Sequence, residues 1–164
     1  MDSADRPTQA QLYCRAIELF GELAVPPCEP TLRIGHKIRE IEVFDPLRRK
    51  FVALTPEEWV RMHFVAYMID TLGYSPLRIA NEVHIVLNDT RRRADTVVYD
   101  DTLRPQVVVE YKAPGIALTA DVLNQVLRYN LVFNARAVMI SNGRDVYSYI
   151  GNKLVHGVVR PDDL

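Results

Sequence analysis

The segment that most constrains the fold is QVVVEYK at residues 106–112. Its Val107, Val108 and Val109 are apolar on both faces of an extended chain, so a strand here must be central and covered on both sides. Pro114 follows closely and ends the strand. The sequence therefore predicts a sheet that carries helices on its two faces.

Two segments have the features of these covering helices. Thr55 caps the first, Pro56 occupies its first position, and Glu58 completes a Thr-x-x-Glu capping box. This helix is expected to end at Gly73. The second helix spans about residues 119–133 and has apolar residues at helical spacing. Its stripe consists of Val122, Val126, Tyr129 and Phe133.

The other expected elements complete a three-layer α/β or α+β domain. The pattern predicts a helix at residues 8–20 and strands at residues 34–44, 50–54, 82–87, 94–99, 137–140, 147–150 and 153–155. Short polar links, with Asn88 and Asp89 in the first, indicate that the three strands before residue 113 form an antiparallel meander. The helix that follows them indicates a parallel crossover. We expect an N-terminal helical extension at residues 1–35 and one globular unit at residues 36–164.

The composition is that of an ordinary globular domain. The chain has 164 residues, enough for one core, and its net charge of -1 does not indicate nucleic-acid binding. No apolar run approaches the roughly 18 residues that span a bilayer, and the N-terminus lacks the apolar segment of a secretory signal. We therefore expect a cytoplasmic protein without membrane contact.

HExxH, GxSxG and P-loop motifs are absent from the sequence. Their absence argues against a zinc metalloprotease, a serine hydrolase with a nucleophile elbow and a P-loop NTPase.

Glu110 and Lys112 are the first candidates for chemistry. They are two residues apart on a strand, so their side chains leave the same face. A buried charge costs several kcal/mol unless it is paired or binds a metal. Taken alone, the two residues are explained best as an ion pair at a strand end.

Asp95 makes a metal site the stronger interpretation. It lies near the start of the preceding strand, where antiparallel pairing would bring it beside Glu110. Two carboxylates about 4 Å apart repel by roughly 4 kcal/mol at a dielectric of about 20, and a hard divalent cation is the commonest reason to hold them together. Lys112 could hold an attacking water or neutralise charge on a phosphate. The sequence thus predicts Asp95 and Glu110 as ligands of Mg²⁺ or Mn²⁺.

Other residues carry weaker signals. Glu58 lies in the same sector as the apolar face of its helix, so it either points into the site or serves only the cap. Gln125 and Tyr129 share a helix face, although an isolated tyrosine at such a position is typical of the core. Two basic clusters are either solvated or meet phosphates. They consist of Arg48, Arg49 and Lys50, and of Arg91, Arg92 and Arg93.

Several of these segments together resemble the N-terminal domain of type I restriction enzyme R subunits. The resemblance covers roughly residues 38–150. It rests on FDPLRRKFVALTPEEWVR, RRRADTVVYD, VVVEYKAP, QVLRYN and MISNGRDVYSY. It implies a PD-(D/E)xK, restriction endonuclease-like fold with three layers, in which helices flank a central mixed sheet.

The resemblance also implies roles for individual residues. The family's catalytic residues correspond to Glu58, Asp95, Glu110 and Lys112, and its Q-x-x-x-Y motif to Gln125 and Tyr129. Ala94 replaces the proline of the motif, and Tyr111 stands where a small residue is usual. The family's ATP-dependent translocase is not found in this sequence, so separate motor or specificity subunits are expected partners.

The leading function is therefore a Mg²⁺-dependent DNA endonuclease, and the resemblance implies 3′-hydroxyl and 5′-phosphate ends. DNA contacts are expected at Gln125, at Tyr129 and at the basic cluster of residues 91–93. The alternative is a catalytically inactive nucleic-acid-binding or interaction module with the same fold. The intact set of Asp95, Glu110 and Lys112 favours the enzyme. A structural protein of an unrelated α/β fold would leave these residues dispersed.

Overall fold

The computed structural model describes residues 6–37, 40–87 and 89–164. The helices are α1 (Gln9–Phe20), α2 (Pro56–Asp70) and α3 (Ala120–Asn130), with short 3-10 helices η2 (Pro76–Arg78), η3 (Leu131–Phe133) and η4 (Pro161–Asp163). The strands are β1 (Leu32–Ile34), β2 (Ile41–Asp45), β3 (Lys50–Ala53), β4 (Ile79–Leu87), β5 (Thr90–Tyr99), β6 (Pro105–Tyr111), β7 (Ala137–Ser141), β8 (Val146–Ile150) and β9 (Lys153–His156). Within these ranges, no helix is both long enough and apolar enough to cross a membrane.

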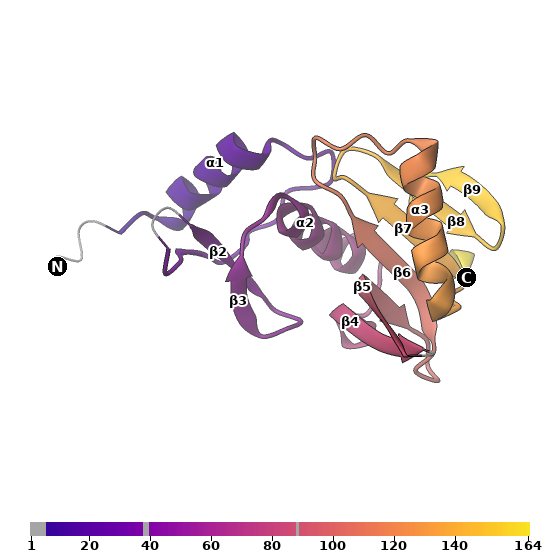
Figure 1. Ribbon diagram of the computed structural model, residues 1–164. Helices are drawn as coiled ribbons and strands as arrows, with labels where there is room; N and C mark the ends of the chain where they lie inside the picture. Colours follow the sequence, from indigo (N-terminus) through magenta and orange to yellow (C-terminus); the bar gives the residue numbers. More distant parts are fainter. Residues whose placement is uncertain (1–5, 38–39, 88) are drawn as a thin grey trace.

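The strands form two sheets, which Figure 1 shows on opposite sides of α2. The larger sheet has the order β4-β5-β6-β7-β8-β9. Its first three strands are an antiparallel meander, β7 is parallel to β6, and β8 and β9 continue antiparallel. The smaller sheet is antiparallel with the order β1-β2-β3. The predicted meander, parallel crossover and terminal hairpin are all confirmed.

Strand β6 is the centre of the molecule, as its apolar sequence predicts. Val107, Val108 and Val109 are each 0% exposed. Val107 and Val109 belong to the core that α2 covers, whereas Val108 packs with Phe133 on the opposite face. Helix α3 covers that second face, which gives the predicted three layers of helix, sheet and helix.

Helix α2 contributes to two cores, because it is apolar on more than one side. Phe64 and Met68 are fully buried against the large sheet. Trp59 packs on the other side with α1 and the small sheet, and its indole N–H donates to the carbonyl oxygen of Gly21 at 3.1 Å. The helix therefore connects the small sheet rigidly to the large one.

Two expectations were wrong in detail. Residues 34–44 do not form one strand: β1 ends at Ile34, and the Gly35 N–H donates to the Glu40 carbonyl oxygen across a connection to β2. The small sheet consequently has three strands, and β1 pairs with β2 across the expected boundary at residue 35.

Tyr129 is not part of the apolar stripe of α3 and is 55% exposed. Of the expected turn residues, Asn88 lies outside the described residues.

Candidate active site

The β5–β6 register brings Asp95 and Glu110 together, as predicted. Thr96 pairs with Val109 in this antiparallel pair of strands. Asp95, one residue before Thr96, therefore lies opposite Glu110, one residue after Val109. Asp95 is 8% exposed, and its Oδ2 accepts the backbone N–H of Tyr111 at 3.0 Å. Lys112 directly follows β6, and its charge reaches Glu110. Asp95, Glu110 and Lys112 thus converge at one end of the central strand pair.

The carboxyl group of Glu110 is strongly perturbed by this environment. Burial, followed by repulsion from Asp95 and hydrogen bonding with it, raises the pKa of Glu110 to about 8. Hydrogen bonding by Asn130 and the charge of Lys112 oppose this rise in part. At neutral pH the pair therefore holds a proton. Perturbation of this kind by burial and a specific charged neighbour is typical of functional sites.

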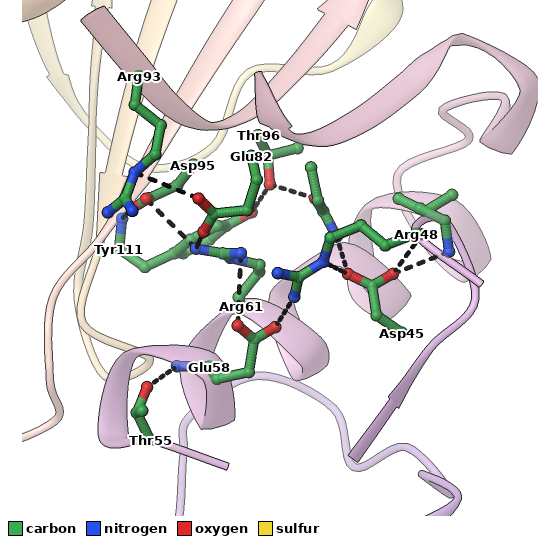
Figure 2. Close-up of polar contacts among 12 residues, drawn as sticks. Asp45, Arg48, Thr55, Glu58, Arg61, Glu82, Arg93, Asp95, Thr96 and Tyr111 are labelled. Carbon is green, nitrogen blue, oxygen red and sulfur yellow. Dashed lines mark hydrogen bonds and ion pairs between the residues drawn. The ribbon is translucent and has the colours of Figure 1, made fainter. Parts of the chain in front are cut away.

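Arg61 of α2 forms the centre of an ion-pair network beside Asp95 (Figure 2). Its Nη2 lies 2.6 Å from Oε1 of Glu82 and 3.3 Å from Oδ1 of Asp95, and its Nη1 lies 3.4 Å from Oε2 of Glu58. Arg61 is only 4% exposed. Burial lowers its pKa, but the three carboxylates outweigh that effect and raise the pKa above its ordinary value. The guanidinium is therefore permanently charged.

A second arginine extends the network to the small sheet (Figure 2). Arg48, in the turn between β2 and β3, binds Asp45 and also donates to Oε1 of Glu58 at 2.5 Å. Asn81 donates to Asp45 at 2.9 Å and accepts from Thr96 at 2.6 Å. Burial raises the pKa of Asp45, but hydrogen bonds from Asn81 and Arg48 outweigh it, so the net pKa is lowered. Arg48 is thus an internal partner of the network.

Glu58 points into this network, which decides between the two roles considered for it. The Thr55 hydroxyl accepts the Glu58 backbone N–H at 3.1 Å, so the helix cap exists. The Glu58 side chain, however, bonds to Arg48 and Arg61. Two guanidinium groups attract a carboxylate more strongly than one backbone N–H, which explains why the second half of the predicted capping box is not formed.

Arg61 and Glu82 were not identified from the sequence. Arg61 had a detectable signal, because it lies three residues after Glu58 on a helix whose neighbouring positions are apolar. Glu82 has a φ of +56°, and the β4–β5 register passes from Asn81–Thr96 to Val83–Ala94 without pairing it. Such a conformation costs a non-glycine residue roughly 1–3 kcal/mol and has no sequence signature.

The predicted nucleic-acid-binding residues lie on an adjoining surface. Gln125 and Tyr129 are both exposed on α3, and the Arg92 guanidinium lies 4.8 Å from the Tyr129 ring centroid. Arg91 is exposed, whereas Arg93 pairs with Glu82 at 3.2 Å. The residues therefore form one surface of α3 and β5, and their binding role stays a prediction.

The geometry fits a divalent ion that is held only partly by the protein. Within the described ranges, no group of three or more His, Cys, Asp or Glu residues is arranged to hold a metal. Asp95 and Glu110 offer two hard oxygen donors. Mg²⁺ is commonly bound by one or two carboxylates together with waters and substrate phosphates. Such an ion would be held by Asp95 and Glu110, with waters, and substrate phosphates when they are bound, completing its coordination shell.

Comparisons with known proteins point to one family. The family model described as type I restriction enzyme R protein N terminus matches residues 56–158. No curated protein matches the chain. The fold is similar to the fragment structure of a proposed HsdR subunit of a type I restriction enzyme from Vibrio vulnificus YJ016, with a TM-score of 0.51 and 15% identity. The match covers 68% of this chain and 24% of that one, so it spans about a quarter of the other structure.

The raised pKa of Glu110 predicts a specific pH dependence of stability. The folded chain holds a proton that the unfolded chain releases near the ordinary pKa of 4.5, so this group lowers the free energy of unfolding as pH rises from about 4.5 to about 8. In the presence of chelator, Glu110→Gln should therefore be more stable than the wild type at pH 8 by up to about 4 kcal/mol, since the pKa of Glu110 is raised from 4.5 to about 8 and one pKa unit is about 1.4 kcal/mol. At pH 5 the two proteins should be nearly equal.

Urea unfolding at the two pH values measures this difference. The matched control is Glu57→Gln, one residue before Glu58 on α2, where the side chain is exposed. Its stability relative to wild type should not change with pH. A Glu110→Gln protein that is less stable than the wild type at pH 8 would contradict the assignment.

Proposed function

This chain belongs to the family of type I restriction enzyme R protein N termini, and on that basis we propose that it is a Mg²⁺- or Mn²⁺-dependent DNA endonuclease. The observation that carries the proposal is the convergence of Asp95 and Glu110 on adjacent strands, with Lys112 beside them. A protein gains no stability from two carboxylates at such proximity, because they repel one another. The restriction-related family and the fold both support this use of the site.

The side chains have separable tasks in phosphodiester hydrolysis. Asp95 is held in place by the Tyr111 N–H and by Arg61, so its orientation is fixed before substrate arrives. Glu110 would have to give up its proton to hold a metal ion, so metal binding should release protons. The bound ion would supply positive charge that stabilises the phosphate as it is attacked.

Lys112 supplies the remaining charge on the substrate side. Its backbone N–H is fixed by a 2.9 Å bond to the Ser141 carbonyl oxygen, which continues the parallel pairing of β6 and β7. The ammonium group can orient the attacking water and stabilise charge on the phosphate. Glu58 acts on the site from α2 through Arg61, and we assign it a positioning role.

Partners follow from the same family membership. In a restriction system, DNA is the expected substrate, and we propose that motor or specificity functions are supplied by other subunits. The exposed surface of Gln125, Tyr129 and Arg92 adjoins the site and suits contact with the DNA backbone, since phosphate contacts position a duplex without reading its sequence.

Cleavage by a Lys112→Ala variant tests the proposed enzyme. With supercoiled plasmid and Mg²⁺ or Mn²⁺, the wild type should cut, chelator should stop it, and Lys112→Ala should be about 100- to 1,000-fold slower, as for loss of one preorganised stabilising group. Lys153→Ala, at an exposed position of β9, is the control and should cut normally. Wild-type protein that binds DNA but never cuts it would support the inactive binding module instead.

Tyr129→Ala tests the proposed DNA surface. Because Tyr129 is 55% exposed, its truncation should leave thermal stability nearly unchanged, whereas loss of a core aromatic typically costs about 3–5 kcal/mol. DNA affinity should fall roughly tenfold, about 1.4 kcal/mol, to a similar degree for unrelated sequences. Leu154→Ala, an exposed residue of β9, is the control. Unchanged affinity in a folded Tyr129→Ala protein would remove this surface from the binding site.

A further inference from the structure

We propose that Arg61 is a built-in cation of the site, which therefore takes one divalent ion, at Asp95 and Glu110, and excludes a second. This inference rests on the proposed metal dependence and specifies it further. The Arg61 guanidinium occupies the position beside Asp95 that a second metal ion would take.

Arg61 occupies a position that would suit a cation bound between carboxylates. The guanidinium lies among carboxylates from three different elements: Glu58 of α2, Glu82 of β4 and Asp95 of β5, at 2.6 to 3.4 Å (Figure 2). Its Nε and Nη1 are buried without a hydrogen-bond partner among the described residues. Attraction between charges, and not saturation of its donors, therefore accounts for its place. A bound metal ion would likewise be held by the negative charge of these carboxylate oxygens.

The carboxylates around Arg61 are already neutralised by arginines. A second ion beside Asp95 would have to recruit Glu58 or Glu82. Glu58 contacts both Arg48 and Arg61, and Glu82 contacts Arg61 and, at 3.2 Å, Arg93. A dication placed there would be repelled by guanidinium groups that cannot lose their charge.

Glu110 differs from these two carboxylates. Within the described residues it has no ion pair with an arginine, and the positive charge that acts on it is that of Lys112. Asp95 is shared, since one of its oxygens faces Arg61 while the carboxylate as a whole also interacts with Glu110. The charge balance therefore leaves one place for a dication.

The backbone of β4 supports a dedicated role for this arrangement. Glu82 has a φ of +56° at the point where its side chain reaches both Arg61 and Arg93. Residues held in this region persist only when the surroundings over-determine them, and they cluster at functional sites. The strain is what one expects if the position of the guanidinium matters to the site.

Counting bound Mn²⁺ tests the inference without relying on cleavage. Mn²⁺ alone is titrated into the full chain, and the bound ions are counted by electron paramagnetic resonance. The wild type should bind one ion per chain. Arg61→Gln, which removes the charge but keeps similar bulk, should bind two, and Arg61→Lys should restore the count to one. Arg33→Gln makes the same change at an exposed pair with Glu42 in the small sheet and should stay at one.

Each result has a distinct meaning. Two ions in the wild type would overturn the inference but leave the proposed endonuclease standing. No bound ion in the wild type would overturn the proposed metal dependence and the inference with it. One ion in a folded Arg61→Gln protein would show that Arg61 does not exclude a second. If Arg61→Gln does not fold, the wild-type count still decides between one ion and two.

Discussion

The buried charge of Arg61 is the interaction on which the rest of the site depends. Its partners come from α2, β4 and β5, so this one side chain fixes how the helix sits on the large sheet. Removing one partner of a buried ion pair typically costs about 3–5 kcal/mol, because the other charge is left uncompensated. Through Glu58 and Arg48 the same network reaches the turn between β2 and β3. The small sheet is thereby coupled to the end of β6.

The network also explains how the chain tolerates Asp95 and Glu110 side by side. Arg61 compensates Asp95, and a retained proton compensates Glu110. The proton on Glu110 could leave if a metal ion bound, whereas the positive charge of the Arg61 guanidinium could not. If the proposed metal dependence holds, such a site would take one dication and would be less stable without it than an apolar alternative, which is the usual relation between stability and function at active sites.

The sequence predicted the large sheet and its central carboxylates because both follow from short-range pattern. The valines of β6 required cover on two faces, and short links fixed the meander that sets Asp95 opposite Glu110. Glu82 escaped prediction because its partners Arg61 and Arg93 are distant in sequence and no periodicity relates them. Arg61 and Asp45 each have one partner three residues away, but their contacts with Asp95 and Asn81 join segments that are far apart in the chain. Tyr129 was misplaced on the apolar stripe because helical spacing alone cannot distinguish a core position from its exposed neighbour, and Leu123 is buried instead. The roles of Gln125, Lys112 and the other proposed site residues stay predictions.

A crystal structure of the protein with Mn²⁺ would show whether Asp95 and Glu110 hold one metal ion beside Arg61. Anomalous diffraction locates the metal independently of any assay. The proposed one-ion site predicts a single anomalous peak within coordination distance, about 2.0–2.3 Å, of oxygen atoms from both Asp95 and Glu110, with Arg61 still bound to Glu82. A peak that involves Glu58 or Glu82 in place of Glu110, or the absence of any peak near Asp95 at saturating Mn²⁺, would contradict it.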